Sequence, residues 1–167
     1  VYINALQYRG PLDVFRRPEG EAQDRQRPLY EQAATMLLNA VNQNPGDPQA
    51  PIALEYAATA LERTQRFSSA GDLYQRIIDE VGPRRGSTPD EQASLDRIVS
   101  NAYFRLAFNA ERFFDFDRAV QSYQVLADSP RFASSQDPSI RDRRVDALVN
   151  TAVIMQNLQR YPQATQY

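Results

Sequence analysis

The chain has 167 residues, of which 42% are hydrophobic and 24% charged, and this composition is typical of one folded domain of ordinary size. It contains no cysteine and no histidine, which excludes disulfides, thiolate nucleophiles, imidazole catalysis and zinc sites built on these residues. A net charge of −2 and the lack of any long apolar run give no reason to expect nucleic acid or membrane insertion. We therefore expect a binding protein with no catalytic activity, no cofactor and no metal.

Residues 1–27 predict an irregular leader. They contain prolines, glycines and arginines and show neither a helical nor a strand period. Their apolar residues, among them Leu12 and Phe15, are too many for a free tail, so we expect part of the leader to pack on the helices after it. Because Val1 is not a methionine and a helical pattern still runs at Tyr167, we expect the chain to be a piece of a longer protein.

A lone helix is predicted over residues 28–45. Apolar residues recur there at three- and four-residue intervals, which places them on one face of a helix. The turn-forming run from Asn44 to Pro48 ends this helix.

Residues 47–82 predict a helical hairpin. Asp47 is the expected N-cap, with Pro48 in the first turn, where a missing N–H costs nothing. The pattern breaks at residues 65–66, and a second helix starts at Phe67. So short a turn forces two helices to lie antiparallel and side by side.

The same unit returns over residues 88–129 and again over residues 137–167, where it is cut short. Thr88 and Asp137 are the expected N-caps, and each precedes a proline. Asp115 lies at the turn of the second hairpin and is expected to cap the helix after it. The residues that separate these two hairpins predict a loop.

The hairpins share one spacing of small and aromatic residues. An alanine midway along the first helix is followed 12 residues later by an alanine on the second, with an aromatic residue three positions before it. Two antiparallel helices approach closely only where small side chains face each other, and bulky ones fill the space beside them. The alanines and the aromatic residue are Ala58, Ala70 and Phe67 in the first hairpin, Ala107, Ala119 and Phe116 in the second, and Ala152, Ala164 and Tyr161 in the third.

This pattern resembles the tetratricopeptide repeat (TPR) family over residues 28–167. The resemblance implies an all-α fold in which antiparallel hairpins stack as a right-handed α-solenoid, with the leader packed on it. A generic helical bundle is the alternative. The matching residues are Leu54, Ala57, Ala58, Leu61, Phe67, Ala70, Tyr74 and Ile77; Tyr103, Leu106, Ala107, Ala110, Phe116, Ala119, Tyr123 and Leu126; Leu148, Thr151, Ala152, Met155, Tyr161 and Ala164; and, in the lone helix, Tyr30, Ala33, Leu37 and Ala40.

The repeats are longer than those of the family. The family repeats about every 34 residues, whereas Ala33, Ala70, Ala119 and Ala164 are separated by 37, 49 and 45 residues. The surplus lies in the loops over residues 83–86 and 131–136 and in lengthened helices. Such insertion-bearing repeats are similar to those of bacterial cell-envelope and gliding-motility proteins, which implies a periplasmic or envelope location.

The resemblance also indicates where a partner would bind. Solenoid repeats bind on the concave face, which in this family is lined mainly by the first helix of each hairpin. An apolar ladder across the last two hairpins favours a groove for an amphipathic helix or an extended apolar peptide. The alternative is that the long helices or the leader cover Phe104 and Phe108. The residues expected to contact the partner are Phe104, Arg105, Phe108, Val149, Asn150 and Val153.

The function predicted from the sequence is therefore that of a non-catalytic scaffold or adaptor in a multiprotein assembly, with a protein or peptide as its partner. Two other functions stay open: a recruiting or regulatory domain of a larger enzyme, and self-assembly through the terminal repeats. If the groove residues are covered, the binding surface moves to the convex face or to the loops at Arg84 and Arg131.

Overall fold

The computed structural model describes residues 23–158, which form α-helices and no strand. The all-α class is thus confirmed for these residues. The irregular leader, apart from its last five residues, and the helix expected from Tyr161 lie outside them. The helices are α2 (Gln23–Gln43), α3 (Ala50–Arg63), α4 (Phe67–Val81), α5 (Pro89–Arg112), α6 (Phe116–Asp128), α7 (Pro130–Ala133) and α8 (Pro138–Asn157).

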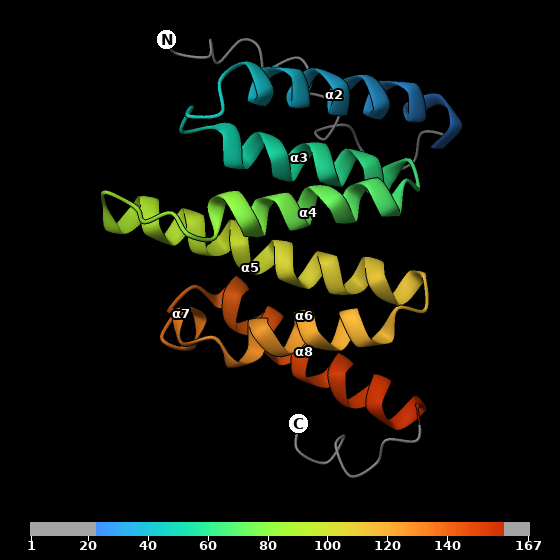
Figure 1. The fold of residues 1–167 in the computed structure, drawn as a ribbon, viewed down its shortest axis with the longest axis vertical. Coiled ribbons are helices and arrows are strands. Elements are labelled where there is room, and N and C mark those ends of the chain that lie inside the picture. Colours follow the sequence, from blue (N-terminus) through green and yellow to red (C-terminus); the bar gives the residue numbers. More distant parts are fainter. Residues whose placement is uncertain (1–22, 159–167) are drawn as a thin grey trace. The chain divides into compact units, whose positions relative to one another are not determined.

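The chain divides into two compact units between Tyr74 and Gln75, inside α4. In the first unit, α2 and α3 pack against each other and run antiparallel (Figure 1). In the second unit, α5 and α6 form an antiparallel pair, and α8 packs on both of them (Figure 1). The short helix α7 connects α6 to α8 and contacts α5, α6 and α8.

Helix α2 begins at Gln23, before the start expected at Pro28, so the last residues of the predicted leader are helical. Pro28 lies inside the helix. As the sixth residue of the helix, Pro28 lies beyond the four N–H groups that have no intrahelical partner, so its missing N–H removes one intrahelical hydrogen bond. The polar residues ahead of Pro28 carry no apolar period, so the pattern could not reveal this first turn.

The N-cap expected for α3 is wrong by two residues. Gln49 occupies the cap position, and Pro51 instead of Pro48 lies in the first turn. Asp47 caps the preceding turn: its Oδ1 accepts a hydrogen bond from the Gln49 N–H at 2.7 Å. Its carbonyl accepts one from the Ala50 N–H at 2.9 Å. Two prolines three positions apart both fit a first helical turn, and the chain uses the second.

The other expected caps are confirmed, and each is a side-chain oxygen that accepts a hydrogen bond from a backbone N–H in the first turn. These bonds start α5, α6 and α8 at the positions that the sequence indicates. The pairs are Thr88 with the Glu91 N–H at 3.2 Å, Asp115 with the Arg118 N–H at 3.3 Å, and Asp137 with the Ser139 N–H at 2.8 Å.

The loop expected over residues 131–136 is partly helical, because α7 occupies its first residues. Ser129 caps this helix by accepting a hydrogen bond from the Arg131 N–H at 3.3 Å, and Pro130 follows in the first turn. This is the same cap-and-proline signature that starts α5 and α8. The short helix α7 places Phe132 in the interior of the second unit, where 1% of its surface is exposed.

The alanines expected at the close contacts between helices are fully buried in the first two hairpins. Ala58 and Ala70 in the first unit, and Ala107 and Ala119 in the second, have no exposed surface. The third case differs, since Ala152 is only half-buried. In α8, the small residues that face the core are Ala147 and Thr151. Ala164, the expected partner of Ala152, lies outside the described residues.

Candidate functional site

A partly buried polar link joins α5, α6 and α8. The Tyr123 hydroxyl on α6 donates a hydrogen bond to Glu111 Oε1 on α5 at 2.6 Å and accepts one from Asn150 Nδ2 on α8 at 3.1 Å. The ring of Phe104 meets the Tyr123 ring edge to face, with 5.5 Å between centroids. Burial, and then the hydrogen bond to the Glu111 carboxylate, raise the pKa of Tyr123, so its hydroxyl stays protonated and keeps donating.

Phe104 and Phe108 are both half-buried. The sequence left two alternatives, an open groove or phenylalanines covered by other elements, and the observed exposure is intermediate between them. The Phe104 ring packs on Tyr123 in the interior of the second unit. Two guanidinium groups lie over Phe108: that of Arg105 is 5.2 Å from the ring centroid and that of Arg112 is 4.9 Å from it. Cation–π contacts at such partly exposed sites contribute about 0.5–1 kcal/mol each. At Phe108, α5 therefore presents an aromatic ring held under two cations.

The outer face of α8 carries a ridge of valines. Val145, Val149 and Val153 are 59%, 54% and 47% exposed and recur every fourth residue, so they lie in one row along the helix. We call these three residues the valine ridge. The opposite face of α8 is buried, as Ala147 and Thr151 show. A helix that buries one face in the core has no folding reason to place an apolar row on the other.

The structure thus distributes the six residues predicted to contact a partner among three roles. Val149 and Val153 are exposed together on α8, whereas Asn150 donates into the polar link beneath them. Phe104 packs partly inside, and Arg105 covers Phe108. Sequence reasoning missed Val145, although its spacing of four from Val149 carries the signal that would have found it. The TPR-based register began the third groove at Val149 and so left out the preceding turn.

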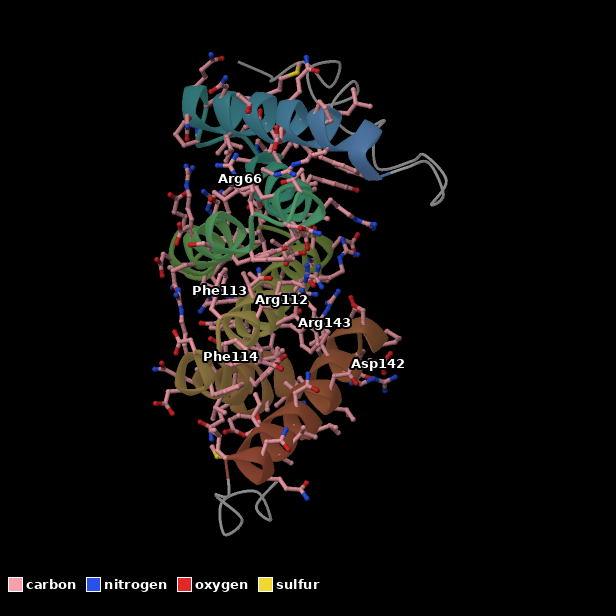
Figure 2. The ribbon with its side chains drawn as sticks, turned by 90° about the vertical axis from the view of Figure 1, so that its right-hand side faces the viewer. Arg66, Arg112, Phe113, Phe114, Asp142 and Arg143 are labelled. Carbon is pink, nitrogen blue, oxygen red and sulfur yellow. The ribbon has the colours of Figure 1, made fainter. Side chains whose placement is uncertain are left out.

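Two carboxylates and two arginines beside the valine ridge have different surroundings. Asp142 and Asp146 are exposed on the same face as the ridge, and neither makes a hydrogen bond or ion pair with another described residue. Arg143 instead reaches Ser100 Oγ on α5 at 3.4 Å, and Arg144 donates to the Ala127 carbonyl on α6 at 2.6 Å. Figure 2 shows that Asp142 and Arg143 leave α8 in different directions. The arginines hold α8 on its neighbours, and the carboxylates face outward. Arg141, which is also exposed, lies at the opposite edge of this face.

The alternative binding loop at Arg131 has a structural role that the sequence did not reveal. Arg131 Nε pairs with Asp96 Oδ1 on α5 at 2.6 Å, with both side chains less than one-fifth exposed. Arg131 Nη1 also donates to the Gly82 carbonyl at the end of α4. These bonds fasten α7 to its neighbours in the second unit. At the other loop, Arg84 Nε donates to the Glu80 carbonyl at 3.0 Å.

A small cavity of about 260 Å³ lies in the second unit between α4, α5 and α6. Its apolar lining comes from Ile78, Tyr103, Leu106 and Val125, and its polar lining includes Arg118. Burial raises the pKa of Tyr103, which keeps this phenol neutral. Among the side chains that the structure describes, no group of three acidic residues is placed to hold a metal ion.

Comparison with known proteins gives no family, because no protein-family model, no curated protein and no solved structure matches the chain. Within the described part of the chain, none of the helices combines the length and the apolar character that a membrane crossing requires.

Proposed function

We propose that this chain is a non-catalytic adaptor that binds a helix or peptide of a partner protein through α5 and α8, and that its helices stack as a TPR-like right-handed solenoid. The observation that carries the binding function is the valine ridge. Isolated exposed apolar residues are ordinary on a protein surface, but a row of three on a helix whose other face is buried is typical of an interaction surface.

The surroundings of the ridge support binding to a protein. Aromatic and arginine side chains are enriched in protein interfaces, and α5 supplies Phe104, Phe108 and Arg105 beside α8. The polar link through Tyr123 fixes α5, α6 and α8 against one another. A surface held in this way needs little ordering when a partner binds, which lowers the cost of association.

A pair of variants tests the binding function. In V149S/V153S the ridge loses two of its three valines, while V125S replaces a valine of α6 that is 40% exposed and serves as the matched control. Partners cross-linked to the wild-type chain should be retained by V125S and lost from V149S/V153S, with the helical content of both variants unchanged. Equal retention by the three proteins would contradict the assignment of the site to α8.

A further inference from the structure

The molecule itself contains an example of how a helix covers such a row. Because Ala107 and Ala152 correspond in the repeat, Ser100, Phe104 and Phe108 of α5 correspond to Val145, Val149 and Val153 of α8. Ser100, the first position of the α5 row, lies beside α8: it is fully buried and accepts a hydrogen bond from Arg143 of α8 at 3.4 Å. The covering element at Ser100 is therefore a helix that brings an arginine to the row.

The face of α8 that corresponds to this partly covered face of α5 has no helix over it among the described residues, as the exposure of the valine ridge shows. It differs from the α5 face in two ways. All three positions of its row are aliphatic, and two carboxylates, Asp142 and Asp146, lie along its first half without an ionic partner among the described residues. Helix positions four apart are neighbours, so these two carboxylates form one acidic edge.

We infer that the valine ridge and its acidic edge bind an amphipathic α-helix of a partner protein, with aliphatic side chains over Val149 and Val153 and a lysine or arginine opposite Asp142 and Asp146. This inference rests on the proposed adaptor function and specifies its partner. Rows of residues four apart interdigitate with the same rows of another helix, which is the commonest way in which helices pack in globular proteins. The carboxylates then select the orientation and the charge of the incoming helix.

The test uses a phage-displayed library of amphipathic helical peptides whose polar positions are drawn equally from acidic, basic and neutral residues. We expect the full chain to enrich peptides with an aliphatic stripe and basic residues beside it. For the best peptide, D142N/D146N should weaken binding roughly five- to tenfold at low salt and flatten the dependence of Kd on salt concentration. The variant V149S/V153S should abolish binding. The matched controls V125S and D128N, both on the surface of α6, should leave the Kd unchanged.

The outcomes separate the two proposals. If peptide binding needs the valines but is indifferent to D142N/D146N and to salt, the acidic edge has no role and this inference fails while the adaptor site stands. If acidic peptides are enriched, or if no peptide is, the inference fails as well. If peptides bind V149S/V153S as tightly as the wild type, both proposals fail. Sedimentation equilibrium of the chain alone adds one more outcome: self-association that V149S/V153S abolishes would make a second copy the occupant and overturn the inference.

Discussion

Two turns of the molecule have the same backbone and different side chains. The turn between α3 and α4 contains Gln65 at φ 62°, and the turn between α5 and α6 contains Phe114 at φ 59°. In each, the N–H after this residue donates to a carbonyl five positions back, from Arg66 to Leu61 at 2.8 Å and from Asp115 to Ala110 at 3.0 Å. The left-handed conformation that both adopt is costly for any residue with a Cβ.

The side chains of the two turns face different surroundings. Thr64 is 2% exposed and its Oγ1 donates to the Leu61 carbonyl at 2.9 Å. Phe113 and Phe114, which take the places of Thr64 and Gln65, are 57% and 79% exposed (Figure 2). The backbone hydrogen bonds therefore define this turn, because it forms both around a buried threonine and around an exposed pair of phenylalanines. The phenylalanine pair contributes little burial energy to folding.

Exchanging the first residue of the two turns should have strongly unequal effects. Thr64→Phe forces a ring into a buried position and removes a hydroxyl hydrogen bond, so we expect a loss of roughly 2–3 kcal/mol in the free energy of unfolding. Phe113→Thr should change it by about 0.5 kcal/mol or less, since the ring is mostly exposed. Denaturant titrations would measure both, and similar losses would mean that the two positions are equally packed.

The next largest change in stability is expected at Asp115, the capping residue of the second turn. Asp115→Ala removes the side-chain cap of α6 and should cost about 1 kcal/mol. The corresponding residue of the first turn is Arg66, so Arg66→Asp should add a cap to α4 and stabilise the chain by a similar amount, about 0.5–1 kcal/mol. A destabilising effect of Arg66→Asp in thermal melts would show that the two turns are less alike than their hydrogen bonds indicate.

Glycine should relieve the left-handed residue of either turn. Gln65→Gly and Phe114→Gly should each stabilise by up to about 1 kcal/mol, because glycine adopts a positive φ without steric cost. The two gains should be nearly equal, since the φ values differ by only a few degrees. Melting temperatures would check this, and a loss from Phe114→Gly would mean that its ring stabilises the fold after all.

The smallest effect concerns pH and the cap of α8. Hydrogen bonds from the Ser139 hydroxyl and backbone N–H hold the pKa of Asp137 below its ordinary value. A carboxyl whose pKa falls on folding stabilises the native state fully above its unfolded pKa, and this contribution disappears as the pH falls through the folded pKa. Asp137→Asn should therefore lower the free energy of unfolding at neutral pH. The difference in this free energy between the variant and the wild type should become smaller at acid pH. A gap that stays constant in melts from neutral to acid pH would contradict this.

Much of the fold was readable from the sequence because its signals are local. The caps at Thr88 and Asp137 and the turn at residues 114–115 depend on neighbouring residues, and the structure has them where the sequence puts them. The first turn of α2 and the whole of α7 were missed. The former carries no apolar period, and the latter spans only four residues.

The candidate site was less predictable because its determinants are distant in sequence. Asn150 has the position of a groove residue, yet its amide donates to Tyr123, 27 residues away. Arg131 lies in a predicted loop, yet it pairs with Asp96, 35 residues away. No pattern of spacing within one helix identifies such partners. The exposure of the valine ridge depends likewise on the elements that pack over α8, which only the three-dimensional structure shows.

We place the binding surface on the valine ridge, open in the free chain, whereas the half-buried phenylalanines of α5 beside it also pack against the second unit. Thermal melting of V149S/V153S and of F104S/F108S tests this directly. We expect the valine variant to melt close to the wild type, and the phenylalanine variant to lose roughly 2–4 kcal/mol because both rings are half-buried. A loss from V149S/V153S as large as that from F104S/F108S would show that the ridge is covered in the free chain, and would contradict the assignment of the binding surface to it.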